Sequence, residues 1–439
     1  MSGQLYCGAG KANITPPEAY LANLQALGPQ RFSGILDPLF VRVIMLQNGE
    51  EAALIVSFDL DKAPNHEEFT KALSELTGVP EQSILYFGIH THTAPIMGYR
   101  PFEPNGDVTK KPKACQDAFY QYTDLIKAGL LQAAGEAKAS LQPARIGWGH
   151  GASYINVNRC CHYEIVDENG NPKKLVETGY NGAGPVSRDV FVLRAESLTG
   201  EPIAFFVNYA MHNVVMFLHD SGDGGIYVSH DVGGCVSLNL ENRFPGSVAI
   251  WSSGAAGNIN PIMATQNYFP QVSSGEADLS PVQDFKMSVE MRDRLAGRHL
   301  ADIIEANKRI VCTVDHARIQ SVIQWIDLPE KTNQENPPRI RLRMISIGQI
   351  ALIGVNGELF STLGEIIKQN APIKDTVIIN HDCSLMLDNP GYVLDDETNV
   401  LCDQADIVRM PHNGFKAYPG YLPAQLAQKT KEMFRDLDK

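Results

Sequence analysis

The sequence has no hydrophobic run long enough to cross a membrane and no recognisable signal peptide. A membrane-spanning helix needs about 20 consecutive apolar residues, whereas the apolar 44% of this chain is dispersed along it. The first residues, Met1-Ser2-Gly3-Gln4, provide neither the basic nor the apolar segment of a secretory signal. No amphipathic segment is suited to docking on a bilayer. We therefore expect a cytoplasmic protein that does not bind membranes.

Positive charge is also scarce. The chain has 37 Lys and Arg residues against 50 Asp and Glu residues, which gives a formal charge of −13 and a pI near 5.4. This balance argues against binding to a phosphate backbone, so we expect no nucleic-acid partner. The eight cysteines are scattered and lack Cys-x-x-Cys spacing. In a chain of this length they predict reduced thiols, with no disulfide framework.

No low-complexity segment or long linker divides the 439 residues, so we expect one domain over residues 1–439. Three pairs of apolar, β-branched runs are each joined by a turn signal, which predicts β-hairpins. The paired runs are residues 40–47 with 52–58, 190–196 with 203–209, and 340–347 with 350–355. Their second strands are almost continuously apolar, which is typical of strands covered on both faces.

Helical periodicity appears at residues 115–138, 284–307, 359–369 and 422–436. The chain therefore predicts an α/β fold of mixed, largely antiparallel sheets flanked by helices, with polar chemistry along one edge. Residues 95–113, 143–188 and 262–283 are rich in Pro, Gly or Asn, and we interpret them as long loops that form walls or lids.

A His-x-His pair, His90 and His92, follows the buried, β-forming run 83–88. Side chains alternate along a strand, so residues i and i+2 point the same way. Imidazole is the commonest ligand of catalytic zinc, and such a site needs further ligands from elsewhere in the chain. A packed or surface histidine is the alternative for each residue taken alone.

Two further candidates also end apolar runs. His212 closes the run 203–209, and a buried histidine needs a hydrogen-bond partner or a metal. Glu358 follows the run 350–355, and an unpaired buried carboxylate is costly unless a cation or a proton neutralises it. An acid at the positive end of the following helix is an alternative for Glu358, and both descriptions can hold together.

Several polar residues have weaker signals. Asp231, in Ser229-His230-Asp231, is a helix cap or a functional acid, and we favour it over His230 as the functional residue. Asn260 lies in a loop of small residues whose amides can stabilise an oxyanion. Arg159, taken alone, suits a surface position. Asp59 and Asp61 are interpreted as acids that cap a loop, and a place at the site or at a second cation position is the alternative.

Taken in order, these motifs resemble the neutral/alkaline (non-lysosomal) ceramidase family. The likeness begins at residues 8–15, Gly-Ala-Gly-Lys-Ala-Asn-Ile-Thr, where that family has Gly-x-Gly-x-Ala-Asp-Ile-Thr. It continues at residues 90–95, His-Thr-His-Thr-Ala-Pro, where the family has His-Thr-His-Ser-Gly-Pro. The further matches are Asn158-Arg159, Ala210-Met211-His212, Asp231, residues 257–261, Gly357-Glu358 and Gly391-Tyr392.

That family's enzymes are zinc amidases that cut the N-acyl bond of ceramide. Carried over by position, the resemblance implies that His90, His212, Glu358 and Tyr392 bind zinc. His92 and Arg159 match residues that hold the metal-bound water and the substrate carbonyl. This agrees with the residue chemistry, because zinc lowers the pKa of a bound water toward ~7 and so supplies hydroxide at neutral pH.

The chain also departs from the family pattern. Asn260 falls where the family has a catalytic serine, and asparagine cannot act as a nucleophile, although it can donate to an oxyanion. A second tyrosine expected beyond Tyr392 is missing. We expect no C-terminal immunoglobulin-like domain, since the sequence ends soon after its last predicted helix.

The sequence thus predicts a zinc-dependent hydrolase that is similar to ceramidases without acting on ceramide. Zinc-bound hydroxide would attack an amide or ester carbonyl of a small or medium polar substrate, with His92, Arg159, Asp231 and Asn260 in catalytic roles. Two alternatives stay open. One is a metal-dependent lactonase or lyase, and the other is a non-catalytic metal-binding or sensing protein on the same scaffold.

Overall fold

A computed structural model describes residues 3–26, 31–97, 108–217, 219–264, 283–328, 338–383, 390–410 and 418–437. Its largest element is an eight-stranded sheet with the order β13-β10-β9-β6-β1-β3-β4-β5. In that order the strands are Val248–Ser253, Pro202–Tyr209, Asp189–Ser197, Gln142–Ala152, Leu5–Asn13, Phe40–Asn48, Glu51–Phe58 and Ile84–Gly88. Only the β10–β13 and β4–β5 pairs of this sheet are parallel, so the sheet is mixed and largely antiparallel, as predicted.

A second, four-stranded sheet packs against the first. Its order is β16-β17-β18-β20, and its strands are Ile319–Asp327, Arg339–Ile347, Ile350–Val355 and Asp375–Ile379. One buried cluster joins the two sheets, with Ile55 and Leu85 from the first and Ile345 and Leu352 from the second. The two sheets therefore form the middle of the molecule.

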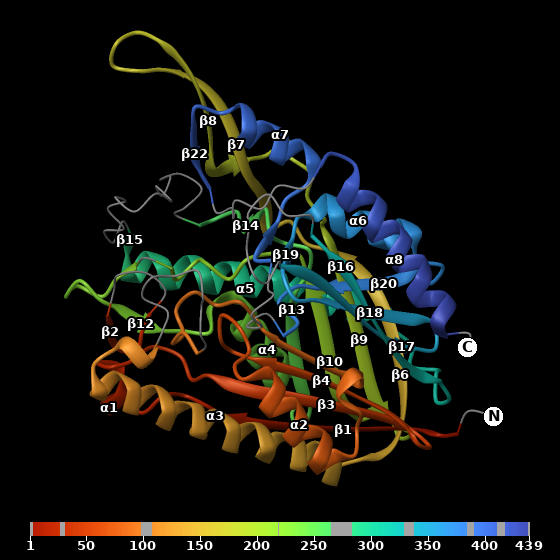
Figure 1. Cartoon of the computed structure of the whole chain (residues 1–439). Helices are drawn as coiled ribbons and strands as arrows, with labels where there is room; N and C mark the ends of the chain where they lie inside the picture. The colour runs from red at the N-terminus through yellow and green to blue at the C-terminus, as the bar shows by residue number, and fades with distance from the viewer. Residues whose placement is uncertain are drawn as a thin grey trace.

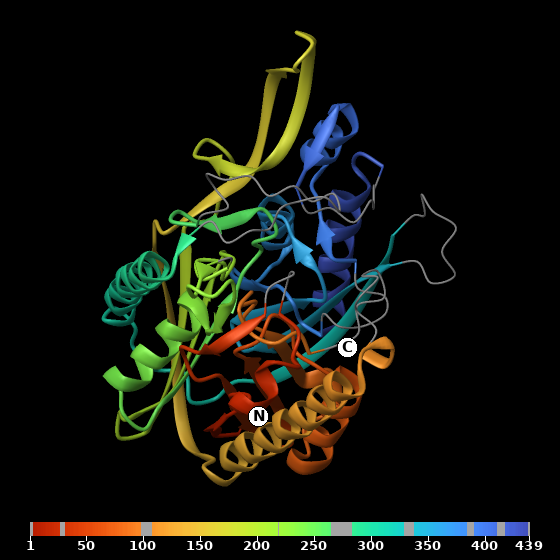
Figure 2. The same ribbon diagram turned by 90° about the vertical axis from the view of Figure 1, so that its left-hand side faces the viewer.

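Helices cover the outer faces of both sheets (Figures 1 and 2). On the large sheet, α2 (His66–Thr77) and α3 (Lys113–Ala139) cover the β1-β3-β4 side. On the same sheet, α4 (Asp231–Arg243) and α5 (Phe285–Asn307) cover the β9-β10-β13 side. The four-stranded sheet is covered by α6 (Ser361–Asn370) and α8 (Tyr421–Leu437). The order of layers is helix, sheet, sheet, helix.

Strand β4 shows why these strands are continuously apolar. Leu54 and Val56 point into the cluster under α3, whereas Ala53 and Ile55 point into the cluster between the sheets. Because successive side chains alternate between faces, a strand covered on both faces needs apolar residues at every position. The three predicted hairpins are confirmed as β3–β4, β9–β10 and β17–β18. The four predicted helices are confirmed as α3, α5, α6 and α8.

The prediction of a long loop at residues 143–188 is wrong. This segment contains β6 together with β7 (Asn156–Val166) and β8 (Pro172–Asn181), and the β7–β8 hairpin extends from the top of the molecule in Figure 1. The glycines of β6 misled the interpretation. A Cβ at Gly147 would lie 2.6 Å from the carbonyl oxygen of Val311, so glycine is present because another backbone approaches the strand closely. Residues 98–107 and 265–282 of the other two predicted loops lie outside the described residues.

Short elements complete the fold. The hairpin sheet has the order β14-β7-β8-β22, with β14 at Ile259–Pro261 and β22 at Ile407–Arg409. The remaining strands are β2 (Phe32–Ile35), β11 (His219–Asp220), β12 (Ile226–Val228), β15 (Gln283–Asp284), β19 (Glu358–Leu359) and β21 (Tyr392–Val393). The remaining helices are α1 (Glu18–Leu21), η1 (Glu81–Ser83), η2 (Val108–Lys110) and α7 (Asp396–Gln404). Among the described helices, none has the length and apolar character needed to span a membrane.

Candidate metal centre

Three of the predicted ligands follow strand ends that meet in space. His90 comes two residues after the end of β5, His212 comes after β10, and Glu358 lies in β19, just beyond β18. The Nε2 atom of His212 is 3.3 Å from Oε2 of Glu358, and the Nε2 atom of His90 is 3.5 Å from the same oxygen. All three side chains are buried. Segments far apart in the sequence thus bring two imidazoles and one carboxylate together.

The other predicted site residues lie around this group, with the exception of Asp231, which is described below. His92 Nε2 lies 3.2 Å from His90 Nε2. Arg159 donates from one Nη to Asn260 Oδ1 at 3.2 Å and has its other Nη 3.2 Å from His212 Nε2. The Tyr392 hydroxyl lies 3.4 Å from His212 Nε2, because β21 pairs with β19 and sets Tyr392 opposite Glu358. The roles assigned to these residues stay predictions.

Asn213 holds the two histidine segments together. Its backbone carbonyl accepts from His92 N at 3.2 Å, and its side-chain amide donates to the carbonyl of Ile89 at 2.6 Å. Its Oδ1 atom accepts from Gly233 N, in the first turn of α4. One buried asparagine therefore fixes the positions of His90, His92 and its own neighbour His212.

Two histidines of the site have left-handed backbones, with φ of 66° at His90 and 69° at His381. Non-glycine residues rarely adopt this conformation, which is found mainly where the surrounding structure imposes it, often at functional sites. His381 was not among the sequence candidates. Its ring stacks on that of His90, with ring centroids 3.9 Å apart and an interplanar angle of 20°.

The neighbouring charges shift the pKa values of His90, Glu358 and His212 in different directions. Burial, the largest effect, disfavours the charged imidazole of His90, but the carboxylates of Glu358 and Asp61 outweigh it and raise the pKa of His90 to about 9. Burial also opposes the charge of Glu358, yet His90 and His212 hold the pKa of that carboxyl well below its usual range. Burial and the neighbouring guanidinium of Arg159 lower the pKa of His212 to about 3. The carboxylates of Glu358 and Asp61 thus favour a positive charge beside them, at the position of His90.

Three further groups, His92, His381 and Tyr392, favour their neutral forms. Burial, followed by the positive charge on His90, keeps the pKa values of His92 and His381 well below the ordinary value for histidine. Burial raises the pKa of the Tyr392 hydroxyl. Within the site, Nδ1 of His92 and Nδ1 of His381 are buried and have no hydrogen-bond partner in the described part of the chain.

Asp61 contacts His90, whereas its neighbour Asp59 is paired with Arg42. Asp61 Oδ1 lies 2.7 Å from Nδ1 of His90, on the side of the ring opposite the nitrogen that faces Glu358. Asp59 instead receives two hydrogen bonds of 2.9 Å from Nη1 of Arg42, and both residues are buried. The interpretation of both as loop-capping acids therefore needs correction for Asp61, since its carboxylate orients a histidine of the site.

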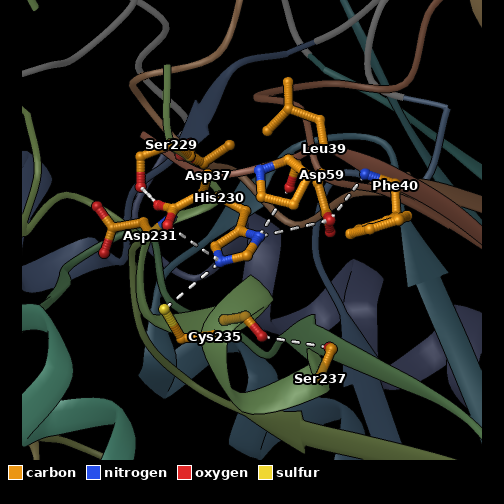
Figure 3. Close-up of polar contacts among 12 residues, drawn as sticks. Asp37, Leu39, Phe40, Asp59, Ser229, His230, Asp231, Cys235 and Ser237 are labelled. Atoms are coloured by element: carbon orange, nitrogen blue, oxygen red, sulfur yellow. Dashed lines mark hydrogen bonds and ion pairs between the residues drawn. The ribbon is translucent and has the colours of Figure 1, made fainter. Parts of the chain in front are cut away.

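Asp231 has no hydrogen bond or ion pair with His90, His212 or Glu358 within the described residues, and Figure 3 shows it beside Ser229 and His230. Its carboxylate accepts from the backbone N–H groups of Met216 and Val232, and burial raises its pKa to about 6. The segment that Asp231 holds carries Phe217, whose ring packs 5.1 Å from that of His92. These contacts favour a supporting position, and the predicted catalytic role of Asp231 stays a prediction.

The donor atoms suit a divalent ion. Glu358 Oε2 is a buried acceptor that has no well-formed hydrogen bond within the described residues, although two imidazole nitrogens face it. The groups His90–His92–His212 and His90–Glu358–His381 each have ligand atoms within 4.8 Å of one another. Imidazole and carboxylate are common zinc ligands, and a carboxylate on the far nitrogen of a ligating histidine is the usual supporting arrangement. The residues present therefore fit the predicted metal.

Two features of the site were missed from the sequence. His381 follows the apolar strand β20, so the same strand-end signal that identified His90 and His212 was present there. Lys62, which places Nζ 3.9 Å from Glu358 Oε1, follows β4 at a short distance but carries no signal of its own.

The fold belongs to the ceramidase-like class, which is established by structural similarity. No protein-family model matches the chain, and no curated protein matches it in sequence. Among solved structures, the chain is similar to neutral ceramidase from Pseudomonas aeruginosa, with a TM-score of 0.69 and 16% identity over 99% of this chain and 74% of that one. It is also similar to a structure described as ceramidase complexed with C2, with a TM-score of 0.70 and 16% identity over 99% of this chain and 75% of that one. The predicted ceramidase-like fold is confirmed.

Proposed function

We propose that this protein is a zinc-dependent hydrolase that acts on the amide or ester carbonyl of a small or medium polar substrate. The observation that carries the proposal is the convergence of His90, His212 and Glu358, with both imidazoles within 3.5 Å of one carboxylate oxygen. The solved structures of similar fold are described as ceramidases, which supports hydrolytic chemistry. When bound, zinc supplies Lewis acidity and makes water a nucleophile at neutral pH.

The side chains around this group divide the remaining tasks. His90, His212 and Glu358 hold the ion, with Tyr392 beside His212. Arg159 is a buried cation in contact with His212 and Asn260, so it stabilises negative charge that develops on the carbonyl oxygen. Asn260 lacks a nucleophilic oxygen, and its amide is suited to donate to the same oxyanion. His92, at 3.2 Å from His90, is placed to hold or pass a proton.

The substrate in this proposal is a small molecule in the cytoplasm, and neither a nucleic acid nor a membrane is a partner. The net charge of −13 disfavours both polyanionic surfaces. A buried site with several charged groups suits a polar substrate that can satisfy them.

The first test is metal analysis of protein purified without a metal-affinity tag, followed by assays of the zinc-loaded enzyme on N-acyl amides, esters and lactones. Alanine at His90 or at Glu358 is expected to remove zinc and activity together. Retention of stoichiometric zinc in both variants would overturn the ligand assignment. Reaction in isotopically labelled water completes the test, because hydrolysis places solvent oxygen in the acyl product and a lyase reaction does not.

A further inference from the structure

His381 is the most unusual residue at the centre that the proposed function leaves without a task. It is 1% exposed, and its Nδ1 atom has no hydrogen-bond partner among the described residues. Burying a polar nitrogen without a partner is unfavourable, so such atoms call for an explanation, of which a missing ion is one.

The backbone of His381 has an energetically unfavourable conformation. Its φ of 69° lies in the left-handed region that side chains other than glycine rarely adopt. The surrounding backbone enforces the conformation, because His381 N donates to the carbonyl of Gly357 at 3.3 Å and Asp382 N donates to that of Val355 at 2.8 Å. These bonds tie the turn after β20 to the segment that carries Glu358. The position of His381 is thus coupled directly to that of the carboxylate.

The ring of His381 is aimed at the same centre. It stacks almost parallel to the His90 ring, at 3.9 Å between centroids, so the two imidazoles lie face to face. One nitrogen of each ring and one oxygen of Glu358 lie within 4.8 Å of one another. Ligand atoms of one tetrahedral zinc ion are separated by about 3.3 Å, given Zn–N distances near 2.0 Å, so a small adjustment of side chains suffices.

A separate ion on the His381 side is less suited to the surroundings. Lys62 places its ammonium 3.9 Å from Glu358 Oε1, and a second dication there would meet this positive charge. The far nitrogen of His90 is already occupied by Asp61 at 2.7 Å. His90 therefore offers one nitrogen to the centre, and a single ion is favoured.

We propose that His381 is an additional protein ligand of this same ion, beside His90, His212 and Glu358. This inference rests on the proposed function and specifies its metal centre. These residues then offer three imidazoles and one carboxylate to the ion.

The experiment uses the full-length protein and the H381Q variant, because glutamine keeps a similar size but binds zinc poorly. The matched control is H230Q. His230 is another buried histidine, and it belongs to neither group of potential metal ligands. Its Nδ1 lies 3.0 Å from the carbonyl oxygen of Pro38 and its Nε2 lies 3.5 Å from Cys235 Sγ. Figure 3 shows the contact with Cys235. Zinc affinity is measured by competition with a chelator, and the cobalt-substituted proteins are compared by visible absorption at saturation.

We expect H381Q to bind zinc at least about 100-fold more weakly, which exceeds the usual effect of losing a supporting residue. Its saturated cobalt spectrum should also change, and H230Q should match the wild-type protein in both measurements. An unchanged spectrum in saturated H381Q would overturn the inference even if affinity fell, because that result describes a merely structural role. If the wild-type protein bound no ion, the proposed function would fail first, so the two failures are distinguishable.

X-ray absorption at the zinc edge gives a second measurement that does not need H381Q to fold. The number of imidazole ligands is counted in the wild-type protein and in H92Q, which removes the other neighbouring imidazole. Three imidazoles in both proteins support His381 as the third ligand. Two imidazoles in H92Q would overturn the inference.

Discussion

Replacement of Asp61 by asparagine should weaken metal binding while leaving the fold intact. Asp61 Oδ1 lies 2.7 Å from His90 Nδ1, and both side chains are buried. The carboxylate therefore keeps the proton of the neutral ring on Nδ1 and leaves Nε2 to face Glu358 and the ion. Asparagine has nearly the same shape but lacks the charge that makes the ring a better ligand.

Loss of such a supporting carboxylate typically weakens metal binding by 10- to 100-fold, which corresponds to about 1.4–2.7 kcal/mol. The assay is zinc affinity by chelator competition, with hydrolysis at saturating zinc measured in parallel. D375N provides the control, because Asp375 also faces an imidazole nitrogen, that of His150 at 3.0 Å, but lies away from the centre. Affinity within twofold of the wild-type value in D61N, or an equal loss in D375N, would refute the reasoning.

Two further predictions concern stability. Arg42 is buried between Asp59 and Glu241, at 2.9 and 2.8 Å, and Glu241 also pairs with Lys11 at 2.7 Å. R42M therefore leaves the buried Asp59 without its cation and Glu241 with Lys11 alone, and it should lower the free energy of unfolding by about 3–5 kcal/mol in denaturant titrations. A loss below about 1 kcal/mol would contradict this account of the ion network. The hydrogen bond with Asp189 is the largest effect that raises the pKa of half-buried His150 in the folded protein. The stabilising contribution of His150 should therefore be complete below about pH 6.5, the ordinary pKa of histidine, and should be lost as the pH rises through the raised pKa of the folded protein. Wild-type and H150Q melting temperatures should therefore differ most at low pH and converge at high pH, and a difference that grows with pH would reverse the sign of the argument.

The sequence by itself determined most of the architecture. Strands such as β4 and β10 are apolar at nearly every position, and helices such as α3 and α8 have clear periodicity, so local patterns specify which faces are buried. The β7–β8 hairpin was missed because its residues are mixed in polarity and its neighbour β6 contains glycines that serve close packing. That packing involves Val311, which is far away in the sequence.

Part of the candidate site was also predictable from local sequence patterns. His90, His212 and Glu358 each end an apolar run, and an abrupt polar residue after such a run is visible in one dimension. His381 carries the same signal after β20, but its relevance emerges only from its stacking on His90.

Only the tertiary structure decided which polar groups become partners. Asp59 and Asp61 are two residues apart and alike in chemistry, yet one binds Arg42 and the other faces His90. Asp231 follows His230 as a plausible acid, yet its carboxylate accepts from the backbone of Met216 and Val232. The physical reason is that burial is encoded locally by hydrophobic pattern, whereas a buried charge is satisfied by whichever distant group the packing of sheets and helices brings within hydrogen-bonding distance.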